Sequence, residues 1–447
     1  MRPNLIVPFV LCLTSAATAQ TLAPTPPMGW NSWDSYGATI DEAQFRTSAA
    51  WVAAHLKPSG YEYVTIDAEW FDADPIPEGS NKDAKRFLDA NGRYIPAPGR
   101  FPSSADGAGF APLAAYVHSL GLKFGIHVLQ GIPKEAVAPN LPIAGSAAHA
   151  KDAANVAAGC QWNPDNYDLQ VSSAGQDYYD SIVKLYAGWG VDLIKIDCIA
   201  SRPYKGDEIR MFHEAIVKSG RPMVLSLSPG EAPFDEAANL QRYAQQWRIS
   251  DDIWDLWHSD NAYPQGVNDQ FARAAKWIGT EQPGHWPDAD MLPFGRLGPA
   301  PGWGKPRNTN LTHDEQRTLM TLWCIFRSPL MYGGDPAATD DWTLALLTNR
   351  EVLAVDQHSR NNRNAVLTDT LAAWTADAAT GGGRYVAVFN RQDTGQDVAL
   401  SWKELGIAGG SHSVKDLWSG SEVKGQGLLR VSLAAHASSM VWVGDQR

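Results

Sequence analysis

Short hydrophobic runs alternate with helical stretches from about residue 25 to residue 335. The runs have the β-branched and aromatic composition of strands. Eight such runs in a repeated βα pattern predict a (β/α)8 barrel rather than a doubly wound sheet, because the sequence lacks a Gly-rich phosphate turn. The expected strands are Met28–Asn31, Tyr61–Asp67, Leu122–Val128, Val191–Asp197, Pro222–Ser228, Gln245–Ile249, Trp286–Asp290 and Arg327–Tyr332.

The stretches between these runs have the amphipathic spacing of helices. Tyr178, Ile182 and Tyr186 recur at intervals of four residues, which places them on one face of a helix. Helices of this kind are expected to wrap a parallel barrel. The clearest helical stretches are Ala111–Leu120, Gly175–Trp189 and Asp207–Lys218.

The pattern changes after Asp356, where polar and apolar residues alternate between turns rich in Gly, Asp and Asn. Alternation with period two and almost no helical spacing predict a small antiparallel β-sandwich of about 90 residues. We therefore expect a barrel at residues 20–356 and a C-terminal β-sandwich domain at residues 357–447. The expected strands of this second domain are Ala372–Trp374, Tyr385–Phe389, Val398–Trp402, Val414–Trp418 and Val431–Val443.

The fourth predicted strand ends in charged side chains. The period of a strand places Lys195 and Asp197 on one side and the isoleucines at positions 194 and 196 on the other. A barrel strand of this kind buries its isoleucines against helices and aims Lys195 and Asp197 into the barrel mouth. A structural ion pair that closes an ordinary strand explains the same residues, and both interpretations stay open on this evidence.

Length and composition are typical of a soluble globular enzyme with two domains. The chain has 447 residues, of which 44% are hydrophobic and 19% charged. The net charge of −12 and the pI near 5.4 disfavour nucleic acid or an anionic membrane as the main partner, because both require a basic surface. A neutral or cationic substrate fits this charge better.

Residues 1–19 have the features of a secretory signal peptide. Arg2 precedes an apolar run, and small residues follow it up to Ala19. The run is shorter than the ~20 residues that span a bilayer, and no later segment is as apolar over that length. We therefore expect cleavage after Ala19 and export to the periplasm or the medium, without a membrane anchor.

The cysteines predict one disulfide in that oxidising compartment. Cys12 leaves with the signal peptide, and the three that remain cannot all pair within one chain. Cys324 lies in the apolar helical stretch 320–326 and is expected to be a buried thiol. The expected pair is therefore Cys160 and Cys198.

Polar side chains gather at the predicted strand ends, where barrels of this class hold their substrates. A second acidic stretch, residues 247–253, contains Asp251 and Asp252 beside Arg248. Two carboxylates without a metal-binding motif or a phosphate loop favour cleavage of a glycosidic bond. The other strand-end residues are Asp67, His127, Lys195, Asp197, Ser228 and Asp290.

Other chemistries have less support. The sequence has neither HExxH nor paired CxxC motifs for zinc, and Ser228 lacks the flanking glycines of a nucleophile elbow. Eighteen tryptophans suit a protein that stacks on sugar rings, with or without catalysis. A non-catalytic sugar-binding protein is therefore the alternative from a different class, although it would not need two strand-end acids.

A series of motifs in fixed order extends from Pro26 to the C-terminus. They are PMGWNSW at residues 27–33, YVTID at 63–67, LKFGI at 122–126, KID at 195–197, WR at 247–248, DADML at 288–292, LTHDEQ at 311–316 and SPL at 328–330. With these motifs the chain resembles glycoside hydrolase family 27, the family of α-galactosidases and α-N-acetylgalactosaminidases.

The resemblance implies a retaining mechanism with two catalytic carboxyl groups. The nucleophile falls on Asp197 and the acid/base catalyst on Asp252. Asp251 is the rival for the second role, but the motif match and the following Ile253 favour Asp252. The sugar-contacting residues that the resemblance implies are Trp33, Asp67, Lys195 and Arg248.

Each catalytic role has a physical requirement. Asp197 must stay ionised, and Lys195 and Arg248 are expected to lie near it and favour its charged form. Asp252 must hold a proton near neutral pH, which calls for a less solvated site than that of Asp197.

The chain departs from the family pattern at three strand ends. α-Galactosidases carry two adjacent aspartates after the second strand, whereas Asp67 is followed by Ala68, with Glu69 as a carboxylate that could reach back. His127 replaces the usual tyrosine and is expected to be a neutral hydrogen-bonding substitute rather than a catalyst. Ser228 aligns near the sugar's 2-position, where a small residue leaves room.

These departures leave the identity of the substrate sugar undetermined, because a site that pairs every substrate hydroxyl discriminates strongly between sugars. An exo-α-galactosidase is the first interpretation. The second is the same mechanism on an α-N-acetylgalactosaminide, a β-L-arabinopyranoside or an isomaltosyl unit. The expected partner is an oligosaccharide or glycoside, without a metal or organic cofactor. The sequence is compatible with a homodimer and leaves subunit association open.

Overall fold

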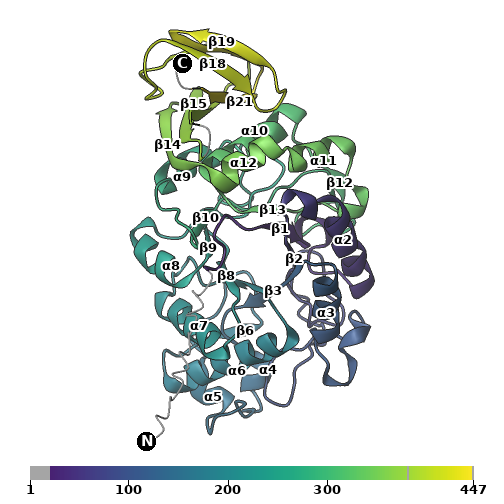
Figure 1. The fold of residues 1–447 in the computed structure, drawn as a ribbon. Coiled ribbons are helices and arrows are strands. Elements are labelled where there is room, and N and C mark those ends of the chain that lie inside the picture. The colour runs from purple at the N-terminus through teal and green to yellow at the C-terminus, as the bar shows by residue number, and fades with distance from the viewer. Residues whose placement is uncertain (1–20, 380–381, 445–447) are drawn as a thin grey trace, which may run out of the picture.

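Eight parallel strands form one curled sheet in the computed structural model, which describes residues 21–379 and 382–444. The strand order is β10-β9-β8-β7-β3-β2-β1-β13, and the strands form a ring in Figure 1. The two ends of the sheet meet where the backbone N–H of Leu292 donates to the carbonyl oxygen of Met331 at 2.7 Å. The predicted barrel is confirmed, while the predicted signal peptide at residues 1–19 lies outside the described residues.

All eight predicted strands are present, and most are shorter than the runs that predicted them. Apolar residues such as Ile249 continue into the loops and stay buried there, so hydrophobicity extends further than strand pairing. The strands are β1 (Met28–Asn31), β2 (Tyr63–Ile66), β3 (Lys123–Leu129), β7 (Leu193–Asp197), β8 (Val224–Leu227), β9 (Gln246–Arg248), β10 (Trp286–Asp288) and β13 (Leu330–Tyr332).

The side chains of strand β7 alternate between the two faces of the sheet as predicted. Ile194 and Ile196 are fully buried in the main core, which they share with residues of the surrounding helices. Leu193 belongs to a separate apolar cluster. Because side chains alternate along a strand, Lys195 and Asp197 share the side of Leu193 and face the barrel interior.

Helices cover the outside of the ring in Figure 1. Helix α6 begins after Ser172, whose hydroxyl accepts a hydrogen bond from the backbone N–H of residue 175, and ends at Gly190 in the left-handed conformation. Its predicted face is confirmed, because Tyr178, Ile182 and Tyr186 are all buried. The helices are α1 (Trp33–Tyr36), α2 (Glu42–His55), α3 (Ala111–Ser119), α6 (Ser173–Trp189), α7 (Gly206–Ser219), α8 (Ala237–Tyr243), α9 (Gln270–Trp277), α10 (His313–Phe326), α11 (Asp341–Thr348) and α12 (Arg350–His358).

A long connection between β3 and β7 was not predicted. It forms a small antiparallel sheet of order β4-β6-β5. Its elements are too short for a hydrophobic period to identify them. They are β4 (Ile132–Pro133), α4 (Lys134–Val137), α5 (Ala150–Ala153), β5 (Ala154–Asn155) and β6 (Asn166–Leu169). Residues 156–165, between β5 and β6, are called the β5–β6 loop below.

The C-terminal part forms antiparallel sheets, as predicted, of order β14-β15-β16-β21-β18-β19 and β17-β20. The prediction of one run over Val431–Val443 is wrong, because the chain turns between β20 and β21. Strands β14 and β19 were missed, since few of their residues are apolar. The strands are β14 (Arg360–Leu367), β15 (Leu371–Asp377), β16 (Arg384–Asn390), β17 (Gln396–Ser401), β18 (Ser411–Asp416), β19 (Glu422–Gln426), β20 (Leu428–Leu433) and β21 (Ser438–Val443).

The C-terminal sheets pack on the barrel through apolar and polar contacts. Trp374 and Phe389 belong to the same buried cluster as the barrel helices. The Trp418 indole N–H donates to the hydroxyl of Thr321 on α10 at 3.0 Å. Figure 1 shows these sheets beyond α10 and α12, away from the ring of barrel strands.

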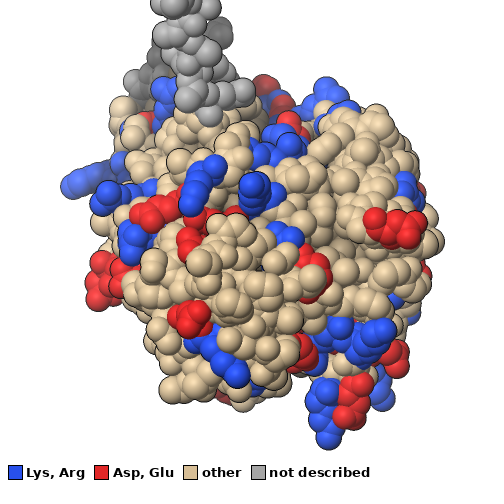
Figure 2. Space-filling model, turned by 90° about the horizontal axis from the view of Figure 1, so that it is seen from below, with Lys and Arg blue, Asp and Glu red and all other residues tan. Residues whose placement is uncertain are grey.

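One face of the molecule has mixed charge. On the face shown in Figure 2, basic and acidic side chains are interspersed among uncharged residues. Within residues 21–379 and 382–444, the helices are all too short or too polar to cross a membrane.

Candidate active site

A pocket of about 430 Å³ lies among the loops that follow the barrel strands. A second surface pocket, of about 480 Å³, lies against α6, and its lining residues include no carboxylate. The first pocket contains carboxyl groups from three strand ends and is therefore the candidate active site. Its lining residues are Trp33, Asp67, Glu78, Trp162, Lys195, Asp197, Arg202, Pro229, Asp251, Asp252, Tyr263, Gly302 and Trp303.

The ammonium group of Lys195 joins the ends of β2 and β7. Its Nζ donates to Oδ2 of Asp67 at 2.8 Å, and the side-chain amide of Asn31 donates to the same oxygen at 2.8 Å. Burial alone would raise the pKa of Asp67, but Lys195 and His127 lower it below its usual value. Asp67 is therefore ionised and held in one orientation at the pocket wall.

The carboxyl group of Asp197 contacts His127 and Ser228. Nε2 of His127 lies 3.1 Å from Oδ2 of Asp197, and the Ser228 hydroxyl donates to the other carboxylate oxygen. Burial would raise the pKa of Asp197. His127, Lys195 and the hydrogen bond from Ser228 outweigh burial and hold this pKa well below its usual range. Asp197 is therefore ionised.

The carboxyl group of Asp252 has the opposite electrostatic balance. Nη2 of Arg248 lies 3.1 Å from Asp252 and 2.7 Å from Asp290, so one cation serves two acids. Burial raises the pKa of Asp252 above its usual value, although Arg248 and Lys195 oppose the rise and Asp197 adds to it. Burial raises the pKa of Asp290 to about 7, with Asp252 and Asp288 adding to the rise and Arg248 opposing it.

One expectation about this pair is wrong. Asp252 was expected to be less solvated than Asp197, yet its side chain is 23% exposed, against 9% for Asp197. Their neighbours distinguish the two carboxyl groups instead. Asp197 contacts His127 and the Ser228 hydroxyl and is also affected by the charge of Lys195, which pairs with Asp67, whereas Asp252 shares Arg248 with Asp290.

Asp251, the rival of Asp252, is already paired. Both carboxylate oxygens accept hydrogen bonds from the guanidinium of Arg202, one of them at 2.7 Å. An arginine that bonds both oxygens of a carboxylate holds that group in one orientation. Asp251 is therefore occupied by Arg202, whereas Asp252 shares its cation with Asp290.

The model of the family described as alpha galactosidase A matches residues 25–139 and 169–358. The chain belongs to this family, glycoside hydrolase family 27. A second model, the alpha galactosidase C-terminal beta sandwich domain, matches residues 368–443. The chain is therefore a glycoside hydrolase, and the alternative of a non-catalytic sugar-binding protein is set aside.

Individual relatives support the same membership. A family 27 β-L-arabinopyranosidase from Geobacillus stearothermophilus has a TM-score of 0.90 and 42% identity, covering 95% of this chain and 97% of that one. Alpha-galactosidase A of Cellvibrio japonicus is 27% identical, covering 94% of this chain and 92% of its own length. The alpha-galactosidase of Cyamopsis tetragonoloba is 29% identical, covering 94% and 86%.

Three side chains of this family 27 hydrolase lie elsewhere than expected. Glu69 does not reach back to the sugar pocket: it is buried and accepts a hydrogen bond from the side chain of Asn163. Ser228 points to Asp197 and is not among the residues that line the pocket. Arg248, expected beside Asp197, pairs with two other acids.

Several residues of the pocket were not identified from the sequence. Tyr263 and Trp303 lie in the long connections after β9 and β10, and Glu78 lies far along the loop after β2. Nothing in their local sequence distinguishes them from ordinary loop residues, because loops bring them to the site from long connections.

One group of acidic side chains in the described part of this hydrolase is spaced closely enough to hold a cation. Carboxyl oxygens of Glu69, Asp72 and Asp165 lie within 4.8 Å of one another. The guanidinium of Arg86 already contacts two of them, Asp72 at 3.3 Å and Asp165 at 2.8 Å. This group is therefore a buried ion-pair network beside the site.

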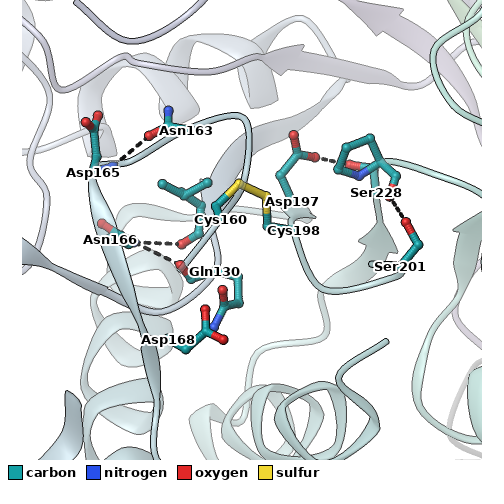
Figure 3. Close-up of a disulfide and its surroundings, with 12 residues drawn as sticks. Gln130, Cys160, Asn163, Asp165, Asn166, Asp168, Asp197, Cys198, Ser201 and Ser228 are labelled. Atoms are coloured by element: carbon teal, nitrogen blue, oxygen red, sulfur yellow. Dashed lines mark hydrogen bonds between the residues drawn. A yellow bond between two sulfur atoms is a disulfide. The ribbon is translucent and has the colours of Figure 1, made fainter. Parts of the chain in front are cut away.

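The predicted disulfide between Cys160 and Cys198 is present, and Cys324 is a buried free thiol, as predicted. Figure 3 shows the disulfide joining the β5–β6 loop to the residue that follows Asp197. A covalent link of this kind restricts the unfolded chain and fixes the loop against the strand end.

We expect the double variant Cys160→Ser/Cys198→Ser to lose about 2–4 kcal/mol of unfolding free energy, because the linkage no longer restricts the unfolded chain. Thermal unfolding of the purified protein measures this loss. Cys324→Ala is the control for a cysteine outside the disulfide. Thiol titration of the unfolded, unreduced protein should find Cys324 as the free thiol; reactive Cys160 and Cys198 would contradict the linkage.

Proposed function

We propose that this family 27 hydrolase is a retaining exo-glycosidase in which Asp197 is the nucleophile and Asp252 the acid/base catalyst. One observation supports this assignment above the others. The two carboxyl groups line the same pocket, and their pKa values are displaced in opposite directions: burial raises that of Asp252, whereas His127, Lys195 and Ser228 outweigh burial and lower that of Asp197. A nucleophile must be ionised and a general acid must be protonated, so the two environments suit the two roles.

In the proposed first step, a carboxylate oxygen of Asp197 attacks the anomeric carbon while Asp252 gives its proton to the leaving oxygen. The glycosidic bond breaks, and a glycosyl ester with Asp197 forms. In the second step Asp252, now ionised, takes a proton from water, and the resulting hydroxide displaces the ester. The sugar leaves with its original anomeric configuration.

The remaining predicted site residues serve two purposes in this proposal. Asp67, Lys195 and Trp33 line the pocket, where charged groups can bind sugar hydroxyls by strong hydrogen bonds. His127 and Ser228 contact Asp197 directly and keep it ionised and oriented. They therefore act through the nucleophile rather than on the sugar.

The first candidate substrate is a terminal α-D-galactoside, as in the curated relatives. The second is a β-L-arabinopyranoside, which has the ring configuration of α-D-galactose but no hydroxymethyl group. Two observations favour it: identity to the Geobacillus enzyme is 42%, against 27% and 29% to the two α-galactosidases, and Ala68 stands where α-galactosidases have a second carboxylate. A sugar with one hydroxyl fewer needs fewer polar partners.

We also propose that the protein is exported. The sequence of residues 1–19 has the features of a signal peptide. The disulfide Cys160–Cys198 is of the kind that persists in oxidising compartments.

The carboxyl roles predict different losses in two variants. Asp197→Ala should lose nearly all turnover of every glycoside. Asp252→Ala should lose about 10²–10⁴-fold on 4-nitrophenyl glycosides, and much less on 2,4-dinitrophenyl glycosides, which leave without a proton. Steady-state kinetics measure both, with Asp251→Ala as the matched control. Equal losses of Asp252→Ala on both leaving groups would contradict the acid role, and a product released first in the opposite anomeric form by NMR would contradict retention.

The environment of Asp197 predicts a pH effect. His127 lowers the pKa of Asp197, so His127→Asn should raise it, and Asp197 should then take up a proton at a higher pH. Loss of kcat/KM on acidification should therefore begin at higher pH than in wild type. Ser228→Ala should shift the acid limb of the pH profile of kcat/KM in the same direction, toward higher pH. Acid limbs that coincide with wild type in both variants would refute this electrostatic role.

The two candidate sugars can be separated by one comparison. We expect wild type to cleave 4-nitrophenyl α-D-galactopyranoside and 4-nitrophenyl β-L-arabinopyranoside, and the ratio of kcat/KM decides between them. A ratio above one for the arabinoside supports the second candidate, because both substrates share the leaving group. The enzyme acts on another pyranoside if it cleaves neither of these substrates but turns over an α-N-acetylgalactosaminide or an isomaltosyl glycoside.

A further inference from the structure

Two large aromatic side chains are exposed at the mouth of the pocket. Trp162 is 39% exposed and Tyr263 is 46% exposed, and both line the pocket. The floor of the pocket is different, because Asp67 and Asp197 are buried. The terminal sugar must reach that floor to meet the nucleophile, so the aromatic rings at the mouth face whatever is attached to the sugar.

Trp162 is held in place on both sides along the chain. Two residues before it, Cys160 is linked to Cys198 at the end of β7. One residue after it, the side chain of Asn163 donates to Glu69, which follows β2. Cys198 comes one residue after Asp197, and Glu69 comes two residues after Asp67. Both links therefore lie beside charged residues of the pocket.

A third attachment lies directly after the β5–β6 loop, at the first residue of β6. The side-chain amide of Asn166 donates to the carbonyl oxygens of Leu129 at 3.2 Å and Gln130 at 3.1 Å, at the end of β3, as the dashed lines in Figure 3 show. The loop is therefore fastened to three neighbouring strand ends. A platform fixed in this way loses little conformational entropy when a ligand binds.

Core packing does not account for this exposed indole. The Trp162 ring meets the edge of the His127 ring, with centroids 6.5 Å apart, and a Cβ at Gly79 would lie 3.2 Å from it. With these contacts Trp162 stays 39% exposed. The loop also lies in residues 140–168, outside both segments that match the alpha galactosidase A model, so the family pattern does not require it.

Tyr263 lies on the side of the pocket where the leaving oxygen is expected. The backbone N–H of Gln265, two residues after Tyr263, donates to the carbonyl oxygen of Asp252 at 3.0 Å, and both Tyr263 and Asp252 line the pocket. Asp252 protonates the leaving oxygen in the proposed mechanism. A group bonded through that oxygen therefore extends past Tyr263.

We propose that Trp162 and Tyr263 form a binding position for the leaving group, selecting glycosides in which a sugar or aryl ring is attached through the oxygen that is cleaved. The flat apolar faces of such rings stack on indole and phenol. This inference rests on the proposed function, because the leaving-group side is defined by Asp252.

The test compares two substrates with the same sugar, namely the 4-nitrophenyl glycoside, which carries a ring, and the glycosyl fluoride, which does not. The sugar is whichever of galactose and arabinose wild type cleaves faster. Trp162→Ala should lower kcat/KM for the nitrophenyl glycoside roughly three- to tenfold, the range expected from loss of one aromatic stack. It should leave kcat/KM for the fluoride unchanged. Trp162→Phe should restore most of the loss.

Phe234→Ala is the matched control, because Phe234 is 41% exposed and does not line the pocket. Tyr263→Ala should repeat the selective loss, and thermal unfolding and thiol titration show that each variant keeps its fold and disulfide. Equal losses on both substrates, or no loss on either, would overturn the leaving-group position while leaving the proposed function intact. If wild type cleaves only an α-N-acetylgalactosaminide or an isomaltosyl glycoside, the same comparison is made with that sugar. Failure of wild type to cleave any of these glycosides would overturn both proposals.

Discussion

The ion pairing of buried carboxyl groups with Lys195 and Arg248 is the constraint on which this site depends. The barrel brings acids from neighbouring strand ends into one pocket, and burial alone would raise all of their pKa values. Lys195 donates to Asp67 and its charge also lowers the pKa of Asp197. Arg248 is shared by Asp252 and Asp290, so its charge compensates each of them less. Burial therefore raises the pKa of Asp252, whereas His127, Lys195 and the Ser228 hydroxyl together outweigh burial and lower the pKa of Asp197.

Barrel and loops contribute different parts of the site. The strand ends supply the charged floor, because parallel strands place their final side chains at one rim. The loops supply aromatic residues and the Arg202–Asp251 pair at the mouth. The β5–β6 loop joins the two parts, since Cys160, Asn163 and Asn166 attach it to the ends of β7, β2 and β3.

Prediction from the sequence succeeded where a local pattern carries the information. The alternation in β7 is enough to place Lys195 and Asp197 inside the barrel, and the apolar stretch around Cys324 is enough to leave it a buried thiol. It failed for Glu69, because a carboxylate two residues after Asp67 looks available until the fold turns it toward Asn163. The relative exposure of Asp197 and Asp252 was also wrong, since it depends on loops far away in the chain.

The sequence by itself determined the barrel, the C-terminal sheets, the disulfide and the positions of the strand-end acids, because periodicity, composition and motifs are local properties of the chain. Only the tertiary structure decided which cation each acid shares and which aromatic residues reach the pocket. Charges and rings act over a few ångströms in space, and the groups concerned, such as Lys195 with Asp67 or Trp162 with His127, are far apart in sequence. Their contacts exist only once the barrel has closed.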